Sequence, residues 1–224
     1  MPINPSHQPP PHYRPSPREA ASRFKQAFRL CCPGWTLKTL VGGGAAVPTF
    51  TSPRERIAIY DEARIAVKHG SFLEIGSHLG ASSIVLAEVL KRMAPPDSKL
   101  FCIDTWMNDA MTEGTKNTWT EFESYTQSWS KWIAPLRGMS TEVQLPDIDA
   151  YDLIFIDGDH SYEGARADAD RFAHLVRPGG RLLMHDHDRA PVARVAGELL
   201  ATGNWAVTRS VGHILSLQRL VAKT

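Results

Sequence analysis

From Ser71 onward, short apolar segments alternate with amphipathic helical segments, and this alternation limits the folds open to the chain. A helix between two strands is long enough to return the second strand parallel to the first. Repeated strand–helix units therefore predict a doubly wound, mostly parallel sheet with helices on both faces. The predicted strands are 72–75, 100–103, 133–136, 151–156, 181–184, 205–210 and 214–220, and the predicted helices end near Met93, Val176 and Ala201.

The last two predicted strands are joined only by Gly212 and His213. A connection this short forms an antiparallel hairpin and cannot form a parallel crossover. The predicted fold class is therefore α/β: a Rossmann-like, doubly wound, mostly parallel seven-stranded sheet with one antiparallel strand from the C-terminal hairpin, plus N-terminal helices.

The region before the sheet domain divides into a tail and a helical extension. Residues 1–16 contain most of a Pro-rich tract, which predicts a disordered or extended tail. In residues 17–70, helices are expected after the two Ser-Pro-Arg-Glu sequences, which have the spacing of an N-terminal capping box. We expect these helices to cover a pocket or to form the interface of a homo-oligomer. The two sequences are 16–19 and 52–55. The first helix is expected to end at Pro33-Gly34, and the second is expected at 53–68, with a flexible link at 42–44 between them.

The sheet domain, residues 71–224, carries an aromatic insert at about 107–132. Thr118 and Glu121 have the spacing of a third capping box. An aromatic stripe at helical spacing is typical of a packing face, and the alternative is a wall on which a sugar ring or planar acceptor stacks. The polar segment 107–117 is consistent with a mobile lid. The stripe consists of Trp119, Phe122, Tyr125, Trp129 and Trp132.

Composition and charge argue against several classes of protein. The 224 residues carry a formal net charge of +1, which gives no electrostatic footprint for nucleic acid or an anionic membrane. No apolar run approaches the ~20 residues that span a bilayer. The Pro-rich N-terminus has no apolar signal-peptide core. The three cysteines lack metal-type spacing, so we expect a protein of the reducing cytoplasm.

Ligands of a doubly wound sheet bind where the strands end, so the residues after each strand are the candidate site residues. Gly76 and Gly80 follow the first strand and let the backbone turn tightly beside a ligand, while Glu74 supplies a carboxylate. Asp104 ends the second strand, where nucleotide-binding α/β proteins place an acid on ribose hydroxyls. This pattern fits a dinucleotide or S-adenosylmethionine.

The glycine loop favours S-adenosylmethionine over a dinucleotide. The dinucleotide fingerprint needs three glycines, and here His78 and Ala81 stand in place of the second and third. A pyrophosphate must approach a helix N-terminus closely, whereas a sulfonium amino acid does not.

Five segments together resemble the class I S-adenosylmethionine-dependent methyltransferases. The likeness is greatest to the branch with the macrolide sugar O-methyltransferases and the cephalosporin-hydroxylase-like proteins, and it covers roughly Ser52 to Leu220. The stretches 157–164 and 178–186 are its most specific parts. The five segments are 72–80, 101–104, 138–140, 156–164 and 175–186.

By position, the resemblance implies a cofactor site along the ends of the first four strands. The predicted cofactor-binding residues are Glu74, Gly76, Ser77 and Gly80 around the methionine end, Asp104 on the ribose, Met139 and Ser140 beside the adenine, and Asp157.

The resemblance also implies a divalent metal site held by Asp157, His185 and Asp186, with Asp159 at the position proposed for a general base. The family places two acids, or an acid and an amide, after the fifth strand, whereas this chain has His185-Asp186-His187-Asp188. This departure leaves two ligand sets open. Either His185 ligates the metal, or Asp186 does so together with His187 or Asp188. We expect Asp159 and His187 to be the catalytic residues.

The implied activity is transfer of a methyl group to the hydroxyl of a small molecule, such as a sugar or natural product. A divalent ion lowers the pKa of an alcohol, and a nearby base removes its proton. Carboxylates suit Mg²⁺, while histidine ligands favour a transition metal. The alternatives are a hydroxylase or oxidoreductase of the cephalosporin-hydroxylase-like type, or a non-catalytic cofactor-binding protein. Membrane and nucleic-acid partners are not expected.

Overall fold

The sheet of the computed structural model has the predicted topology. The structure describes residues 31–107 and 116–221. Seven strands form one sheet in the order β3-β2-β1-β4-β5-β7-β6. All pairs from β3 to β5 are parallel, and β7 runs antiparallel to both β5 and β6. The prediction of a seven-stranded sheet with one antiparallel strand is therefore confirmed.

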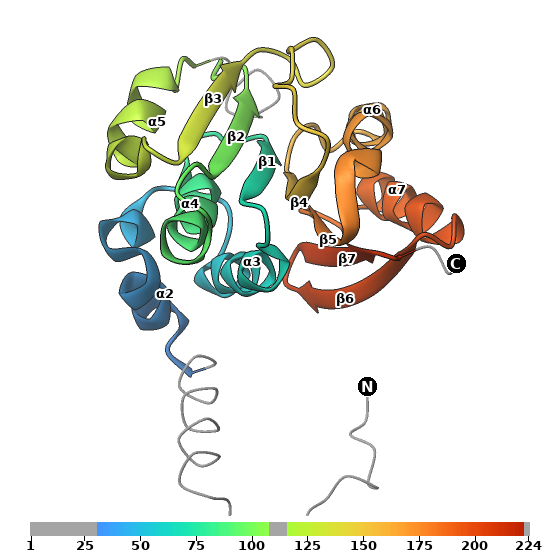
Figure 1. The fold of residues 1–224 in the computed structure, drawn as a ribbon, viewed down its shortest axis with the longest axis horizontal. Coiled ribbons are helices and arrows are strands. Elements are labelled where there is room, and N and C mark those ends of the chain that lie inside the picture. Colours follow the sequence, from blue (N-terminus) through green and yellow to red (C-terminus); the bar gives the residue numbers. More distant parts are fainter. Residues whose placement is uncertain (1–30, 108–115, 222–224) are drawn as a thin grey trace, which may run out of the picture.

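Helices separate most consecutive strands along the chain, except β3 from β4 and β6 from β7 (Figure 1). The strands are β1 (Ser71–Ile75), β2 (Lys99–Asp104), β3 (Ile133–Arg137), β4 (Tyr151–Ile156), β5 (Val176–Met184), β6 (Trp205–Val211) and β7 (Ile214–Arg219). The helices are α2 (Pro33–Val41), α3 (Pro53–Ala66), α4 (Ala81–Met93), α5 (Trp119–Thr126), α6 (Tyr162–Phe172) and α7 (Ala190–Ala201), and the 3-10 helices are η2 (Gly42–Ala46), η3 (Gln127–Trp129) and η4 (Ala173–Leu175).

Helices cover both faces of the sheet, and each face has its own apolar core. α2, α3 and α4 pack on one face, and α6 and α7 pack on the other (Figure 1). Successive residues of a strand point to opposite faces, so Phe72 belongs to the first core and Leu73 to the second. All six residues of β4 are buried, as a central parallel strand requires.

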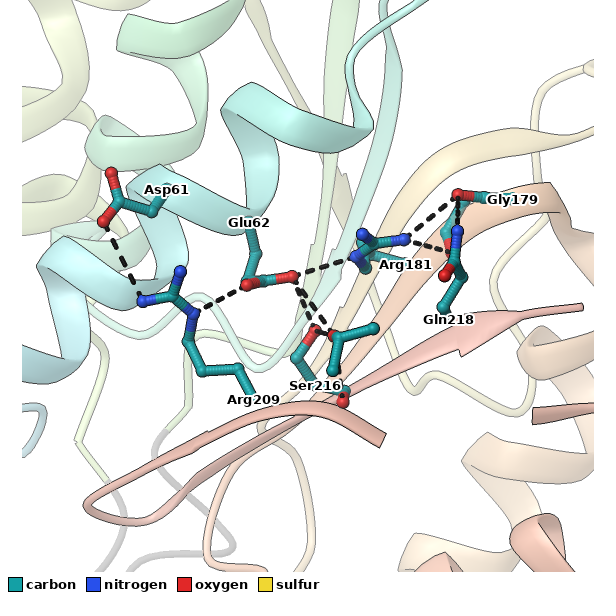
Figure 2. A network of polar contacts seen from close by, with 9 residues as sticks. Asp61, Glu62, Gly179, Arg181, Arg209, Ser216 and Gln218 are labelled. Carbon is teal, nitrogen blue, oxygen red and sulfur yellow. Dashed lines mark hydrogen bonds and ion pairs between the residues drawn. The ribbon is translucent and has the colours of Figure 1, made fainter. Parts of the chain in front are cut away.

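A buried polar network fixes α3 to the C-terminal half of the sheet. Figure 2 shows Glu62 of α3 between Arg181 of β5 and Arg209 of β6. The guanidinium Nε atoms of Arg181 and Arg209 donate to its two carboxylate oxygens at 2.9 and 2.7 Å, and the hydroxyl of Ser216 donates at 3.0 Å. Burial would raise the pKa of Glu62, but contacts with the two arginines hold it below its usual value. The charge is buried with its partners, so the N-terminal helix forms part of the sheet domain's packing.

The N-terminus of α3 also holds the tip of the β6–β7 hairpin. The predicted capping box is present: the hydroxyl of Ser52 accepts from the Glu55 amide, and the Glu55 carboxylate accepts from the Ser52 amide. Glu55 accepts a further hydrogen bond of 2.6 Å from the His213 amide. Gly212 has φ +56, and a Cβ there would lie 2.4 Å from Glu55 Oε1. The tip lies near the end of β5, because β7 starts at the tip and runs antiparallel to β5.

Two expectations for the N-terminal extension are wrong, and the others lie outside the described residues. Pro33-Gly34 was expected to end a helix, but it begins α2, since proline at the first helical position needs no N–H partner. Gly42–Gly44 forms a 3-10 helix in place of a flexible link. The reason is close packing: a Cβ on Gly44 would lie 2.5 Å from Ile84 Cγ2. The tail at 1–16 and the helix predicted from Ser16 are not described.

The capping box predicted at Thr118 is also absent. Thr118 precedes α5, but its buried hydroxyl makes no hydrogen bond. The amide of Trp119 instead donates to Asn117 Oδ1 at 3.0 Å. Glu121, which the box would require, is paired with Lys116 at 2.8 Å.

The boundary between α6 and β5 lies earlier than predicted. The helix was expected to continue to Val176, but α6 ends at Phe172 and η4 follows. Val176 pairs with Tyr151 and starts β5, with a register shift before Arg181 pairs with Leu153. Within the described ranges, no helix is long and apolar enough to cross a membrane.

Candidate active site

The loop after β1 passes very close to the loop after β4. Gly76 has φ +83, and a Cβ on it would lie 2.0 Å from the carbonyl oxygen of Asp157. Gly80, at φ +87, begins α4, and its Cβ would lie 2.5 Å from Thr126 Cγ2. Both predicted glycines therefore occupy positions where a side chain would collide and where positive φ favours glycine. The close approach at Gly76 is to the protein backbone.

Glu74 is fully buried beneath this loop and organises it. Its Oε2 accepts hydrogen bonds from the hydroxyls of Ser77 and Ser83 and from the thiol of Cys102. Burial raises the pKa of the Glu74 carboxyl, and the neighbouring hydroxyls oppose that rise. Glu74 and Ser77, both predicted at the methionine end of the cofactor, are thus brought into direct contact.

Asp104, at the end of β2, connects the loops that follow β1 and β2. Its Oδ2 accepts from the His78 amide at 2.8 Å, and its Oδ1 accepts from the Trp106 amide at 2.6 Å. The indole of Trp106 donates back to the His78 carbonyl at 2.9 Å. The carboxylate is half-buried, and each oxygen retains a free lone-pair direction for a further donor.

Unusual backbone geometry marks the same edge of the sheet. Among the described residues, the non-glycine residues with positive φ are His78 at 46°, Trp106 at 51° and Asp186 at 52°. They follow β1, β2 and β5, respectively. Such conformations cost free energy and concentrate at functional sites, so they support a ligand site along these strand ends.

Four side chains converge where β4 and β5 end: Asp157, His160, His185 and Asp186. One possible ligand atom from each lies within 4.8 Å of every other. His185 Nδ1 is 3.1 Å from Asp157 Oδ1 and 3.2 Å from Asp186 Oδ2. His160 Nε2 is 3.0 Å from Asp186 Oδ2 and 3.7 Å from Asp157 Oδ1. The structure therefore brings together the three predicted metal ligands and adds His160.

The charges in this cluster shift the pKa values of its members. Burial would lower the pKa of His185, but contact with Asp157 and the charges of Asp157, Asp186 and Glu55 raise it to about 9. Burial would raise the pKa of Asp157, but contacts with His160 and His185 hold it below its usual value. Contact with the two histidines therefore favours the ionised form of Asp157, and the neighbouring carboxylates favour the protonated form of His185.

The sequence alone does not place His160 at this site. It lies three residues after Asp157 in a loop, so no helical or strand period places the two side chains together. The available signal was the Asp-x-x-His spacing directly after the most buried strand. Asp186 also forms a second group with Asp188 and His213, whose Oδ1 and Nδ1 are paired at 2.8 Å.

The two predicted catalytic residues flank the cluster and do not join it. Asp159 is exposed, and its two oxygens accept from the amide and hydroxyl of Ser161 at 2.9 and 2.8 Å. His187 Nε2 lies 3.2 Å from the Ser210 hydroxyl of β6.

Met139 and Ser140 follow β3, as expected for a border of the adenine site. Met139 is 49% exposed, and the Ser140 carbonyl accepts from the guanidinium of Arg171 on α6. This contact fixes the loop after β3 to the helix that follows β4.

The aromatic stripe of the insert is mainly a packing face. Phe122 is buried, and Trp119, Trp129 and Trp132 pack against the core of the α2–α4 face. The indole of Trp129 donates to Glu88 Oε2 on α4 at 2.6 Å. Tyr125 is 39% exposed. Most of the predicted lid, 107–117, lies outside the described residues.

Asp168 of α6 is a buried acid beside the site, and we predict that it destabilises the fold when ionised. It is 3% exposed, and burial together with the charge of Asp159 raises its pKa to about 6, against a hydrogen bond from Ser140. Between about pH 4 and pH 6 the unfolded chain ionises this group while the folded chain keeps it protonated. Stability therefore falls as pH rises through that window, by about 3 kcal/mol at most.

Asp168→Asn removes this titration. The free energy of unfolding of the variant minus that of wild type should therefore increase by up to about 3 kcal/mol from pH 4 to pH 7.5. Urea unfolding at both pH values measures the difference. An effect of the substitution that is equal at the two pH values would contradict a raised pKa.

Comparisons with known proteins agree with this fold. The O-methyltransferase NovP superposes with a TM-score of 0.67 at 15% identity, over 89% of this chain and 100% of NovP. TomG of Streptomyces achromogenes, an O-methyltransferase solved with S-adenosylmethionine, gives 0.59 at 16% identity over 93% and 100% of the two chains. An O-methyltransferase of Bacillus cereus solved with S-adenosylhomocysteine gives 0.61 at 16% identity over 88% and 97%. At these identities the likeness establishes the class I methyltransferase fold.

The family is shown by the sequence itself. The sequence model of the methyltransferase domain family matches residues 73–187, just over half of the chain, from β1 through the cluster at the end of β5. The chain belongs to this family and is a methyltransferase. No curated protein sequence gives a significant match.

Proposed function

We propose that this methyltransferase transfers the methyl group of S-adenosylmethionine to a hydroxyl of a small molecule, a sugar or natural product, with the help of a divalent cation. The observation that carries the proposal is the meeting of two sites at one edge of the sheet. The acid Asp104 and the Gly76 loop lie beside the switch point between β1 and β4, and the Asp/His cluster follows β4 and β5.

The residues after β1 and β2 fit S-adenosylmethionine. Asp104 offers two carboxylate oxygens, already oriented by backbone amides, to a ribose diol. Ser77 and Glu74 lie at the methionine end, and Met139 and Ser140 supply the adenine border. In the neighbours TomG and the Bacillus cereus enzyme, the bound molecules are S-adenosylmethionine and S-adenosylhomocysteine, which supports the same cofactor here.

The residues after β4 and β5 fit a divalent cation. His185 is 6% exposed and its Nε2 has no partner, while its Nδ1 and His160 Nε2 lie 3.0–3.2 Å from carboxylate oxygens without hydrogen-bond geometry. Buried polar atoms without partners cost free energy unless they bind something. Asp157, His185 and Asp186 would hold the cation, which when bound polarises the acceptor oxygen and lowers the pKa of its hydroxyl.

The chain's own residues would orient the acceptor and accept its proton. Asp159 is proposed as the base, because it follows Asp157 by two residues, is exposed, and is held by Ser161 with lone pairs to spare. His187 is the second candidate base, near the hairpin. A base positioned in this way typically contributes about 10²–10⁴-fold to the rate.

The proposal also includes an acceptor class, an assembly state and a location. The O-methyltransferase TomG is described as acting in tomaymycin synthesis, which favours a natural-product hydroxyl here. Trp35 and Phe50, on and after α2, are 61% and 65% exposed and give the N-terminal extension apolar surface for a homo-oligomer. Cys31 and Cys32 are adjacent, exposed free thiols, which favours a reducing, cytoplasmic location.

Calorimetric titration with S-adenosylmethionine tests the proposal. We expect wild type to bind, and Asp104→Ala to bind about 10- to 100-fold more weakly, because it loses charged hydrogen bonds. Asp97→Ala is the matched control: this exposed acid lies just before β2, at the opposite edge of the sheet. Failure of the folded wild type to bind either S-adenosylmethionine or S-adenosylhomocysteine would refute the cofactor assignment.

A further inference from the structure

We infer that Asp157, His160, His185 and Asp186 form a mixed nitrogen–oxygen site that selects a transition-metal dication, such as Zn²⁺ or Co²⁺, over Mg²⁺. The inference rests on the proposed function in one respect, because it concerns the cation of the same site. It differs in naming the fourth ligand, His160, and the class of metal.

The spacing of the donor atoms is that of a coordination sphere. The four atoms alternate around a ring in the order Asp157 Oδ1, His185 Nδ1, Asp186 Oδ2 and His160 Nε2, with successive separations of 3.1, 3.2, 3.0 and 3.7 Å. For metal–ligand distances of about 2.1 Å, neighbouring ligands lie about 3.0 Å apart at right angles and about 3.4 Å apart at tetrahedral angles.

An ion-pair network alone explains the arrangement less well. In such a network each histidine N–H points at a carboxylate oxygen. Here His185 Nδ1 and His160 Nε2 lie 3.0–3.2 Å from carboxylate oxygens but lack hydrogen-bond geometry toward them, and His185 Nε2 has no partner. His185 is 6% exposed, so solvent compensates its polar atoms poorly.

The identity of the donors decides the class of metal. Mg²⁺ prefers oxygen ligands in octahedral geometry and retains several waters. Imidazole nitrogen favours borderline ions such as Zn²⁺ and Co²⁺, and two carboxylates neutralise their charge. A site with two imidazoles and two carboxylates therefore binds such an ion far better than Mg²⁺.

The neighbouring group does not offer an equivalent site. It shares Asp186, but Asp188 and His213 are already paired at 2.8 Å and are about half-exposed. Arg189 also lies 3.2 Å from Asp186 Oδ1, on the side away from the oxygen that faces the two histidines. One dication per chain is therefore expected.

Titration of the chelator-treated full-length chain with Co²⁺ tests the inference, since Co²⁺ reports its ligands through visible d–d absorption. We expect one equivalent to bind with a band typical of nitrogen and oxygen ligands, and Zn²⁺ to abolish that band. Mg²⁺ at 100-fold excess over Co²⁺ should leave it intact. His160→Gln and His185→Asp should each weaken Co²⁺ binding by at least about 100-fold. His185→Asp should also raise the affinity for Mg²⁺, because it replaces a nitrogen ligand with a carboxylate.

His174→Gln is the matched control, because His174 is an exposed histidine of η4 outside the cluster, and it should leave the band unchanged. If His185→Asp fails to fold, His160→Gln decides, since His160 is 32% exposed at its side chain. The inference is overturned by absence of Co²⁺ binding, by displacement of Co²⁺ by equimolar Mg²⁺, or by a band that survives His160→Gln.

Titration of the same metal-free protein with S-adenosylmethionine separates this inference from the proposed function. Binding of S-adenosylmethionine by a chain that binds no Co²⁺ would overturn the metal class and leave the methyl donor in place. A chain that binds Co²⁺ but does not bind S-adenosylmethionine would refute the methyl donor and leave the metal class in place.

Discussion

Asp159→Asn is expected to reduce the turnover number for methyl transfer by about 10²–10⁴-fold while leaving the affinity for S-adenosylmethionine within about twofold. The substitution preserves shape, and the amide oxygen can still accept a hydrogen bond from Ser161. It removes the capacity to take a proton from an acceptor hydroxyl. The measurement is transfer of labelled methyl groups to the best acceptor found in a screen of glycosides and phenolic natural products.

Two comparisons make this result specific. Glu163→Gln neutralises another exposed acid four residues later, in the first turn of α6, and should leave turnover unchanged. His187→Gln tests the second candidate base. If Asp159→Asn retains most of the wild-type turnover while His187→Gln loses it, the proton goes to the imidazole and the assignment of Asp159 is wrong.

The sheet could be predicted from the sequence because its signals are local. A buried parallel strand such as β4 needs an apolar run, and a two-residue link such as Gly212-His213 leaves no choice but a hairpin. Features that depend on distant partners could not be predicted. η2 forms because Gly44 packs on Ile84, forty residues away, and β5 starts at Val176 because Tyr151 pairs with it.

The candidate site shows the same division. Asp104 ends β2, and Asp157, His185 and Asp186 follow β4 and β5; because parallel strands end at one edge, their proximity followed from the topology. His160 could not be placed, because the direction of its side chain depends on the path of the β4–α6 loop. The expected closeness of Gly76 to a ligand is, in the structure, closeness to the Asp157 carbonyl, which no local pattern encodes.

The largest effect on stability is expected from Asp152→Ala, at the opposite edge of the sheet from the site. Asp152 is 1% exposed, and its Oδ2 accepts hydrogen bonds from three consecutive backbone amides of the α3–β1 connection, at 2.9, 2.7 and 2.8 Å. Its Oδ1 lies 3.2 Å from Arg177 Nε. The amides belong to Lys68, His69 and Gly70.

Removing this carboxylate leaves three amides and a guanidinium without their acceptor; Asp152 and Gly70 are buried, whereas Lys68 and His69 are exposed. Breaking a buried ionic contact from one side typically costs about 3–5 kcal/mol. That cost is a large part of the roughly 5–15 kcal/mol that stabilises a domain. Urea unfolding followed by tryptophan fluorescence should therefore show a lower midpoint, with the S-adenosylmethionine affinity of the folded fraction unchanged because the site lies at the other ends of the strands.

Asp149→Ala is the matched control, since Asp149 is an exposed acid three residues earlier, and its free energy of unfolding should stay near that of wild type. Asp152→Asn should fall between the two, because its amide retains one acceptor oxygen but loses the charge. A loss below about 1 kcal/mol in Asp152→Ala would show that water replaces the carboxylate at the three amides. In that case the Glu62 network would remain as the main polar attachment of α3 to the sheet.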